Sequence, residues 1–362
     1  MRWHVPYLPP YRPGYGGVFD EPERPWALRP PALIVVELIE GCTVGCPKCG
    51  MRGIRRPDRP YLNTMAQSTI ELIARELIHR KWPTMVDFSG HGEPTARDDW
   101  AETIMWFGHV MRQMGHAHTG VCLTTSGQGL PVGPDAIGRI AELFEHALDV
   151  MVVGRYPQTA AHGRWLSDAL PTILRMKSTL SVGRLPQDKW AEPRPLVSRD
   201  RWPCLITMPA LGPSDLHPRM QWRNEGGLFR TAAAKPHFVC DLPMTQIHIR
   251  WNGDVCICGH DWQGVHWLGN IVETSIQDVW LGERADAARR VLADDRRRLD
   301  PCRRCRTHTG PQIDWFLRPP PTEETRRIVA DSTSREPLYL RDGGESSLPR
   351  MSGSATDRSG LR

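Results

Sequence analysis

The sequence predicts an α/β fold in which a partial barrel of parallel strands is covered by helices and followed by a small cysteine-rich unit. Two observations predict the barrel: short apolar runs recur over residues 32–208, and segments with helical spacing of apolar residues separate them. A third predicts the small unit, because half of the ten cysteines fall within residues 240–305. A chain of 362 residues can hold one large domain and a smaller one.

Strands and helices alternate in the order expected for a parallel sheet. The segments predicted as strands are 32–38, 84–88, 120–125, 148–153, 179–182 and 202–208. The segments predicted as helices are 64–80, 98–114, 134–146 and 158–177. Thr64 or Ser68 can cap the first helix, and Gly115 fits the end of the second. Sites in such barrels lie at the carboxyl ends of the strands, so the loops there are the first place to search.

Three cysteines, Cys42, Cys46 and Cys49, follow the first predicted strand. Their spacing lets three sulfurs converge on one soft metal centre. A cubane iron–sulfur cluster has four irons, so three thiolates leave one iron open for another ligand. A zinc site is the alternative, although structural zinc normally uses four protein ligands.

This spacing, on a loop after a first strand, resembles the radical S-adenosylmethionine (radical SAM) superfamily. The resemblance implies a partial (β/α)6 TIM-like barrel, here placed at residues 32–230. It also implies a [4Fe-4S] cluster whose open iron binds the amino and carboxylate groups of S-adenosylmethionine (SAM). One electron from the cluster would cleave SAM to a 5′-deoxyadenosyl radical, which abstracts a hydrogen atom from the substrate.

Two further loops at the carboxyl ends of predicted strands match the same superfamily. The residues that resemble its GGEP motif, which contacts the SAM amino group, are Gly90, Gly92, Glu93 and Pro94. After the third strand, Thr125 and Ser126 stand at the place of a TNG turn, where small hydroxyl side chains can bond the SAM ribose or methionine groups. A plain polar turn is the alternative reading of this second loop.

Single residues near later strands are also candidates. Arg155 follows the fourth strand and can meet the SAM carboxylate in a bidentate pair, or it can be a solvated arginine at the barrel rim. Cys204 is placed at the end of a barrel strand, where it can give a hydrogen atom to a substrate radical, as a cysteine does in radical SAM epimerases. Lys48 stands where the superfamily commonly has an aromatic residue against adenine.

The carboxy-terminal cysteines follow a second pattern. Alternating residues at 247–251 and 255–258, joined by an Asn-Gly turn, predict a β-hairpin with cysteines at its base. A helix is predicted over 275–292. The order of a cysteine, this hairpin, a Gly-Asn turn, a Trp-containing helix and a CxxC pair resembles the SPASM/Twitch extension of radical SAM enzymes.

The resemblance implies that Cys240, Cys258, Cys302 and Cys305 hold one auxiliary [4Fe-4S] cluster. No cysteine follows Cys305, which is typical of the shorter Twitch-like arrangement. Zinc is the alternative here too, because tetrahedral zinc accepts four thiolates. Cys256 is two residues from Cys258 and is either a spare thiol or an alternative ligand.

Composition assigns the remaining segments. Residues 1–31 are rich in Pro, Tyr and Arg and predict an extended arm, residues 231–318 form the expected auxiliary-cluster domain, and residues 319–362 predict a disordered tail. The sequence has no apolar run long enough for a membrane span and no amino-terminal apolar signal region, so we expect a cytoplasmic protein. In a reducing compartment, close cysteine spacing favours metal binding over disulfides. The net charge of +5, without a basic run interleaved with aromatic residues, does not indicate a nucleic-acid partner.

These observations predict a radical SAM oxidoreductase or epimerase that acts on a small polar molecule, at a carbon bearing a hydroxyl or an amine. The resemblance carries this expectation, because a single auxiliary cluster accompanies aminocyclitol-type oxidation and sugar epimerisation in the superfamily. It also implies an electron donor such as flavodoxin or ferredoxin. Two alternatives stay open: a maturase that modifies a ribosomally made precursor peptide, and a non-catalytic zinc-binding interaction protein.

Overall fold

The computed structural model describes residues 30–31, 33–42, 63–82, 84–114, 119–127, 129–131, 134–155, 181–184, 204–210, 240, 242–261, 264–299 and 302–305. The predicted helix over 158–177 and the predicted tail over 319–362 lie outside these residues, as does the predicted arm apart from residues 30–31. Among the helices that are described, none has the length and apolar character needed to cross a membrane.

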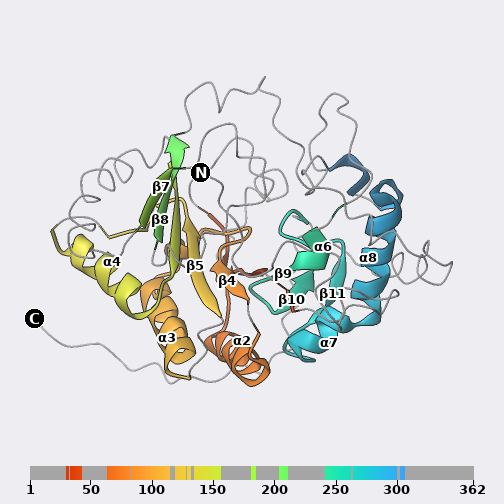
Figure 1. Ribbon diagram of the computed structural model, residues 1–362, viewed down its shortest axis with the longest axis horizontal. Coiled ribbons are helices and arrows are strands. Elements are labelled where there is room, and N and C mark those ends of the chain that lie inside the picture. The colour runs from red at the N-terminus through yellow and green to blue at the C-terminus, as the bar shows by residue number, and fades with distance from the viewer. Residues whose placement is uncertain are drawn as a thin grey trace, which may run out of the picture.

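One nine-stranded sheet organises the described residues (Figure 1). Its strands are β1 (Leu33–Val36), β4 (Met85–Phe88), β5 (Gly120–Thr125), β6 (Val150–Arg155), β7 (Ser181–Arg184), β8 (Cys204–Ala210), β9 (Gln246–Ile249), β10 (Asp254–Cys256) and β11 (Trp267–Asn270). They lie in the order β11-β10-β9-β1-β4-β5-β6-β8-β7. Neighbours from β9 to β7 are parallel, and β10 and β11 add antiparallel strands at one edge.

β1 is the strand that joins the barrel to the carboxy-terminal part of the chain. Ile34 is opposite Val86 of β4 on one side and Ile247 of β9 on the other. Both faces of β1 are covered, which explains why its sequence is a continuous apolar run rather than an alternating one. A separate two-stranded sheet follows β1 and consists of β2 (Ile39–Glu40) and β3 (Asn63–Thr64).

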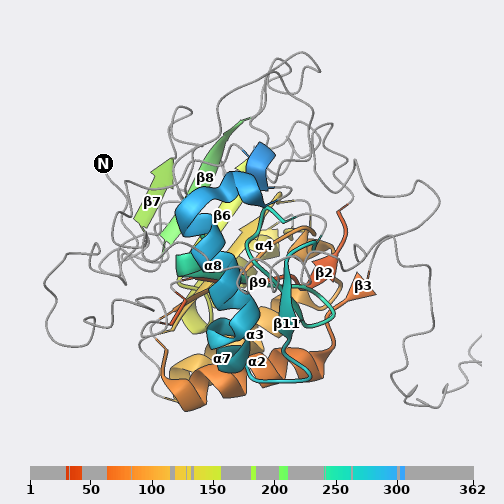
Figure 2. The same cartoon turned by 90° about the vertical axis from the view of Figure 1, so that its right-hand side faces the viewer.

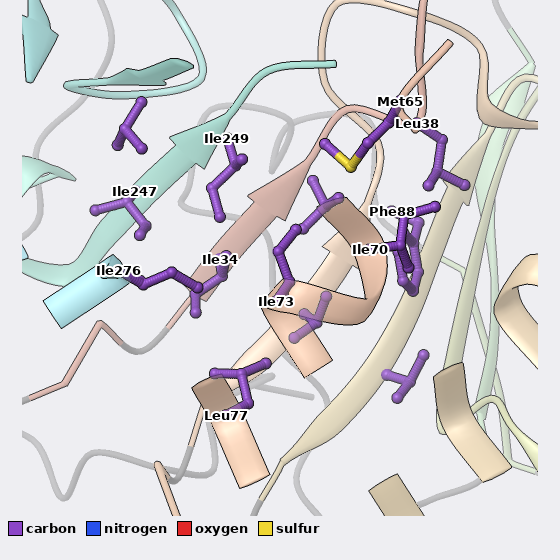
Figure 3. Packing of buried hydrophobic residues seen from close by; sticks show 14 of the residues in the cluster. Ile34, Leu38, Met65, Ile70, Ile73, Leu77, Phe88, Ile247, Ile249 and Ile276 are labelled. Carbon is purple, nitrogen blue, oxygen red and sulfur yellow. The ribbon is translucent and has the colours of Figure 1, made fainter. Parts of the chain in front are cut away.

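Three helices, α2 (Gln67–Arg80), α3 (Trp100–Gln113) and α4 (Pro134–His146), cover one face of the barrel strands (Figure 1). The apolar side of α2 is fully buried toward β1 and β4 (Figure 3). The predicted cap of α2 is wrong: its N-cap is Ala66, which makes no side-chain capping bond. Thr64 cannot cap the helix because its backbone is already paired with Ile39 in the β2–β3 ladder, and Ser68 lies inside the helix.

The carboxy-terminal helices are α6 (Leu242–Thr245), α7 (Ile276–Leu281) and α8 (Glu283–Asp295), followed by the short 3-10 turns η6 (Arg296–Arg298) and η7 (Cys302–Arg304). Figure 2 shows α8 in front of β9 and β11. The single helix predicted over 275–292 is wrong, because the chain breaks at Gly282, which has an extended backbone with ψ 158°. Ser275 caps α7 by accepting a hydrogen bond from Asp278 N at 3.0 Å.

The hydrophobic core runs without interruption from the barrel into the carboxy-terminal part. Ile34 of β1, Ile247 of β9 and Ile276 of α7 belong to one buried cluster (Figure 3). Each fully buried isoleucine contributes roughly 1.5–3 kcal/mol relative to an exposed one. Near α3, Phe88 and Phe107 pack edge to face with ring centroids 5.1 Å apart. Cys240, Cys258 and Cys302 therefore pack against the same core as the barrel strands.

Candidate functional site

The loop after β4, residues 89–95, carries the GGEP-like residues and lies directly against the start of the first cysteine motif; we call it the GGEP-like loop. Glu93 N donates a hydrogen bond to Gly41 O at 2.7 Å. At Gly92, a Cβ atom would lie 1.7 Å from Ile39 O, so only glycine allows this contact. Cys42 follows Gly41 in the chain, which places the first predicted cluster ligand next to this loop.

The other two cysteines of that motif, Cys46 and Cys49, lie outside the described residues. Cys42 is partly buried. That the three thiols hold a cluster therefore stays a prediction.

The Glu93 carboxylate ties the GGEP-like loop to the turn after β5. Oε1 accepts hydrogen bonds from Thr95 N at 3.1 Å, from Thr95 Oγ1 at 2.6 Å and from Thr125 Oγ1. Oε2 accepts one from Ser126 N at 2.6 Å. The structure thus brings the predicted residues Glu93, Thr125 and Ser126 together in one buried arrangement. Since Oε2 carries a single bond here, it has room to accept another from an ammonium group.

Three further residues shape these two loops. Pro94 begins the 3-10 turn η1 (Pro94–Ala96) and is buried. Gly90 has φ +106° and Gly127 has φ +82°, which are left-handed conformations that glycine adopts without strain. Gly127 N donates to Thr125 Oγ1 at 2.9 Å, so the turn after β5 is closed by its own hydroxyl.

The structure separates the two remaining barrel candidates. Arg155, predicted to follow the fourth strand, is instead the last residue of β6, at the carboxyl edge of the sheet. Cys204 is the first residue of β8 and pairs with Val150 and Ser181 at the starts of their strands. At about 3.3 Å per residue, it lies about 20 Å from the carboxyl end of its own strand.

The predicted position of Cys204 at the end of its strand is therefore wrong, and the basis for a hydrogen-donor role is lost. The sequence contains the reason. Pro203 has no backbone N–H to give to a strand ladder, and the strand begins immediately after it.

The four carboxy-terminal thiols line one pocket, which we call the auxiliary pocket. They are Cys240, Cys258, Cys302 and Cys305. Burial raises the pKa of Cys258 and of Cys302 well above the usual thiol value, and the neighbouring cysteines raise both further. Thiols that repel one another's ionisation in this way become stable thiolates when a metal centre binds among them. The donor set therefore fits a four-thiolate cluster or a zinc ion.

Cys256 does not belong to the auxiliary pocket. It ends β10, pairs with His248 and is 1% exposed. Burial, followed by the charge of Asp261, raises the pKa of its thiol well above the usual value. The strand ends at Cys256, so the chain turns before Cys258 and the two thiols do not share one face.

Polar side chains besides the thiols also line the auxiliary pocket, and sequence reasoning missed Asp261 and His266 among them. His266 Nε2 lies 3.7 Å from Cys302 Sγ. Asp261 accepts hydrogen bonds from Val265 N at 3.0 Å and from His266 N at 2.8 Å, which fixes the loop that carries this histidine. Arg296 Nη2 donates to the carbonyl oxygen of Cys305 at 2.8 Å. Asp261 and His266 do not belong to the cysteine spacing pattern, so only the folded chain reveals them.

Five buried polar residues lie together where the GGEP-like loop meets β9; we call them the junction cluster. Its members are Glu37, Glu40, His91, His248 and Arg250, and all are at most 3% exposed. Arg250 Nε is 3.6 Å from Glu37 Oε2, and Arg250 Nη2 is 3.6 Å from Glu40 Oε1. His248 Nε2 is 3.8 Å from Glu37 Oε2.

His91 is the member of the junction cluster that belongs to the GGEP-like loop. Its ring centroid is 4.5 Å from that of His248. His91 Nε2 donates a hydrogen bond to Gly259 O at 2.9 Å. Burial lowers the pKa of His91 well below 6.5, and the nearby His248 and Arg250 lower it further. His91 is therefore a neutral imidazole between the two predicted cofactor regions.

Comparison with known proteins supports both the predicted barrel and the predicted iron–sulfur domain. Residues 240–306 match the SPASM family, an iron–sulfur cluster-binding domain. The fold is similar to that of BtrN in complex with AdoMet and 2-DOIA, with a TM-score of 0.52 and 16% identity over 76% of this chain and 93% of that one. None of the curated proteins with which the sequence was compared matches it.

Two other solved structures are less similar. For anSMEcpe with bound AdoMet and Cp18Cys peptide, the TM-score is 0.44 and the identity 12%, over 84% of this chain and 99% of that one. For Streptococcus suis SuiB, the TM-score is 0.35 and the identity 12%, over 71% of this chain and 67% of that one. Together, the SPASM match and the likeness to BtrN confirm the predicted partial barrel and its carboxy-terminal iron–sulfur domain.

Proposed function

We propose that this chain, which has the fold and the carboxy-terminal SPASM domain of the radical SAM superfamily, is an enzyme that cleaves SAM reductively and abstracts a hydrogen atom from a small polar substrate. One observation carries the proposal. The GGEP-like loop is hydrogen-bonded to Gly41, immediately before Cys42, through Glu93 N at 2.7 Å. The residues that would bind SAM and one residue that would hold the cluster are thus neighbours.

In this proposal Cys42, Cys46 and Cys49 would hold the first [4Fe-4S] cluster. The residues that would hold SAM are Gly90, Gly92, Glu93, Pro94, Thr125, Ser126 and Arg155. When bound, the cluster and SAM supply an electron and a 5′-deoxyadenosyl radical that removes a hydrogen atom from the substrate. The chain's own contribution is orientation, because Glu93 fixes two SAM-facing loops in one geometry.

The auxiliary pocket would provide an acceptor for the second electron of an oxidation. Once a hydrogen atom has left the substrate, a dehydrogenation must still remove one electron and one proton. The four thiols of the auxiliary pocket offer a site for a [4Fe-4S] cluster that accepts this electron. An external donor such as flavodoxin or ferredoxin would supply the electron that cleaves SAM.

A small polar substrate is favoured over a peptide by the four-cysteine arrangement and by the likeness to BtrN, whose complex holds 2-DOIA. We therefore expect dehydrogenation at a carbon that bears a hydroxyl or an amine; epimerisation there would need a hydrogen-atom donor other than Cys204 for the substrate radical. A precursor peptide is the second candidate substrate, and it enters the test below on equal terms.

The test is anaerobic reconstitution with iron and sulfide, followed by addition of SAM and dithionite. We expect release of 5′-deoxyadenosine by the unchanged enzyme, no release by C42S, and nearly full release by C204S, because Cys204 is the first residue of β8, at the end of the strand opposite its carboxyl edge. Absence of 5′-deoxyadenosine from the unchanged enzyme, or a chain that holds zinc and no iron, would overturn the proposal.

The substrate class is identified by transfer of deuterium into 5′-deoxyadenosine. Deuterated sugars, aminocyclitols and candidate peptides are offered in parallel. We expect transfer from a sugar or an aminocyclitol. Transfer from a peptide alone would replace the small-molecule assignment with the maturase assignment, while leaving the radical SAM chemistry intact.

A further inference from the structure

We propose that His91 couples the two cofactor sites, so that SAM binds more tightly when the auxiliary pocket holds its cluster. The inference rests on the proposed function, because it concerns the same SAM site. His91 stands between Gly90 and Gly92 in the GGEP-like loop and is not among the residues predicted to bind SAM. Its role is to position that loop.

The contact from His91 to the auxiliary region is specific in direction. A carbonyl oxygen only accepts hydrogen bonds, so the proton of His91 lies on Nε2, which donates to Gly259 O at 2.9 Å. Gly259 follows Cys258, a thiol of the auxiliary pocket. One hydrogen bond therefore connects the GGEP-like loop to the residue beside a proposed cluster ligand.

Beyond His91, hydrogen bonds and close packing hold the GGEP-like loop in place. Glu93 is bonded to Gly41 through its backbone and to Ser126 through its carboxylate. Gly92 packs against Ile39 with no room for a Cβ atom. A shift of His91 must therefore move the backbone that carries Glu93, since close-packed interiors transmit small displacements.

The segment that receives the bond carries Cys258, one of the thiols of the auxiliary pocket. Backbone contacts hold it locally, with Asp261 N donating to Cys258 O at 3.1 Å and Ile257 N donating to His266 O at 3.2 Å. A cluster ligated by the four thiols would add covalent anchors at Cys258. Loading the auxiliary pocket would thus fix Gly259, and through it His91.

A metal ion in the junction cluster is the competing explanation for this histidine. Ligand atoms of Glu37, His91 and His248 lie within 4.8 Å of one another. Arg250, however, already places a guanidinium 3.6 Å from Glu37 Oε2, and repulsion between two cations at that carboxylate disfavours a second one. The junction cluster is better explained as a set of buried ion pairs that supports the His91–Gly259 contact.

The coupling is tested by a double-mutant cycle on the reconstituted enzyme. The dissociation constant of SAM is measured by equilibrium dialysis for the unchanged enzyme, for C302A/C305A, for H91L and for the combined variant. We expect C302A/C305A to weaken SAM binding about fivefold or more, H91L to weaken it similarly, and the combined variant to be no weaker than H91L. The coupling would be overturned if the factors by which C302A/C305A and H91L weaken SAM binding multiply in the combined variant. It would also be overturned if C302A/C305A does not change the dissociation constant of SAM.

Matched variants separate positioning from packing. H91Q keeps a donor near the place of Nε2 and should bind SAM within about twofold of the unchanged enzyme. H109L alters an exposed histidine of α3 and should bind as the unchanged enzyme does. If H91Q binds as weakly as H91L, the hydrogen bond is not the coupling element and the proposal is wrong.

A second measurement needs no cysteine variant. Coupling between two binding sites is reciprocal, so SAM should change the electron paramagnetic resonance signal of the reduced auxiliary cluster in the unchanged enzyme and in H91Q, but not in H91L. An enzyme that binds SAM without this change refutes the coupling alone. An enzyme that does not bind SAM at all refutes the proposed function as well.

Discussion

Glu93 joins the loop after β4 to the turn after β5 through one side chain. Both oxygens of its carboxylate accept bonds from buried donors, among them Ser126 N at 2.6 Å. An amide in its place would turn one acceptor into a donor that faces another donor. A single residue thus controls the relative position of two loops that would surround SAM.

We expect Glu93→Gln to lower the rate of 5′-deoxyadenosine release at least about tenfold, because the two loops lose their common acceptor. The free energy of unfolding should fall by about 1–3 kcal/mol, the usual penalty for an unsatisfied buried donor. Urea unfolding and product analysis measure the two effects. Glu142→Gln, on the exposed face of α4, is the matched control and should change neither quantity; equal losses in both variants would contradict the argument.

His91 also makes stability depend on pH. Burial lowers its pKa below 6.5, so below about pH 6.5 the unfolded chain binds a proton that the folded chain does not. The free energy of unfolding should therefore fall as the pH is lowered from 7.5 to 5.5, by up to about 1.4 kcal/mol per pH unit from this residue. His91→Gln should flatten the curve of urea midpoint against pH, whereas His109→Gln should not. Parallel curves for all three proteins would exclude this contribution.

At the scale of elements, the GGEP-like loop is held by close packing as much as by hydrogen bonds. A Cβ atom on Gly92 would lie 1.7 Å from Ile39 O, whereas a Cβ atom on Gly138 in α4 would meet no atom within 4 Å. The two glycines provide a matched pair.

We expect Gly92→Ala to lower the free energy of unfolding by about 1–3 kcal/mol or more and to abolish SAM binding, because a backbone segment must move. Gly138→Ala should leave SAM binding unchanged and raise the free energy of unfolding by up to about 1 kcal/mol, because alanine favours the helix. Urea unfolding and equilibrium dialysis measure both variants. Normal SAM binding by Gly92→Ala would show that the loop is looser than its packing indicates.

Elements with local boundary signals could be predicted from the sequence. β5 and α4 have the predicted limits, because Gly120 and Pro134 mark their starts locally. The break at Gly282 could not be foreseen, since the spacing of apolar residues continues across it. In the folded chain, a Cβ atom at this position would lie 2.6 Å from Asp278 O, so the break is built around a glycine.

The residues of the candidate site also fall into those that the sequence could predict and those that it could not. Glu93 and Ser126 could be found because the motif residues stand after successive strands. His91, His248 and Arg250 could not, because their relationship depends on β9 pairing with β1, and such pairing between distant segments leaves no local pattern. Cys204 was misplaced for a simpler reason, as the strand begins at this residue and not before it.

At the scale of the whole molecule, the barrel and the SPASM domain share a sheet and a core. β9 pairs with β1 over its full length, and Ile247 packs in the same cluster as Ile34. Removing the carboxy-terminal part would expose an apolar edge strand to solvent, which favours aggregation.

We therefore expect a chain truncated after residue 239 to aggregate, although it retains all of the barrel strands. A chain truncated after residue 318, which lacks only the predicted tail, should elute as a folded species from a size-exclusion column. Elution of the shorter fragment as a compact folded species would show that β1 does not need its carboxy-terminal neighbour.

The two proposed cluster sites also predict an iron and sulfide content for the whole protein. We expect near eight irons and eight sulfides per chain after reconstitution, and near four of each in C302A/C305A, because each cubane contains four irons. Metal analysis and acid-labile sulfide assays provide the counts. Unchanged counts in C302A/C305A would place the second cluster elsewhere.

The pairing of β1 with β9 also limits how domains of this protein can be exchanged. An auxiliary domain from another enzyme cannot simply be joined here through a flexible linker. Its first strand must take the place of β9 and pair with β1 in the same register, with Ile247 opposite Ile34. Chimeras should be cut at positions that preserve this ladder. For the same reason, natural exchange of such modules would be restricted to donors whose strand already fits the groove it enters.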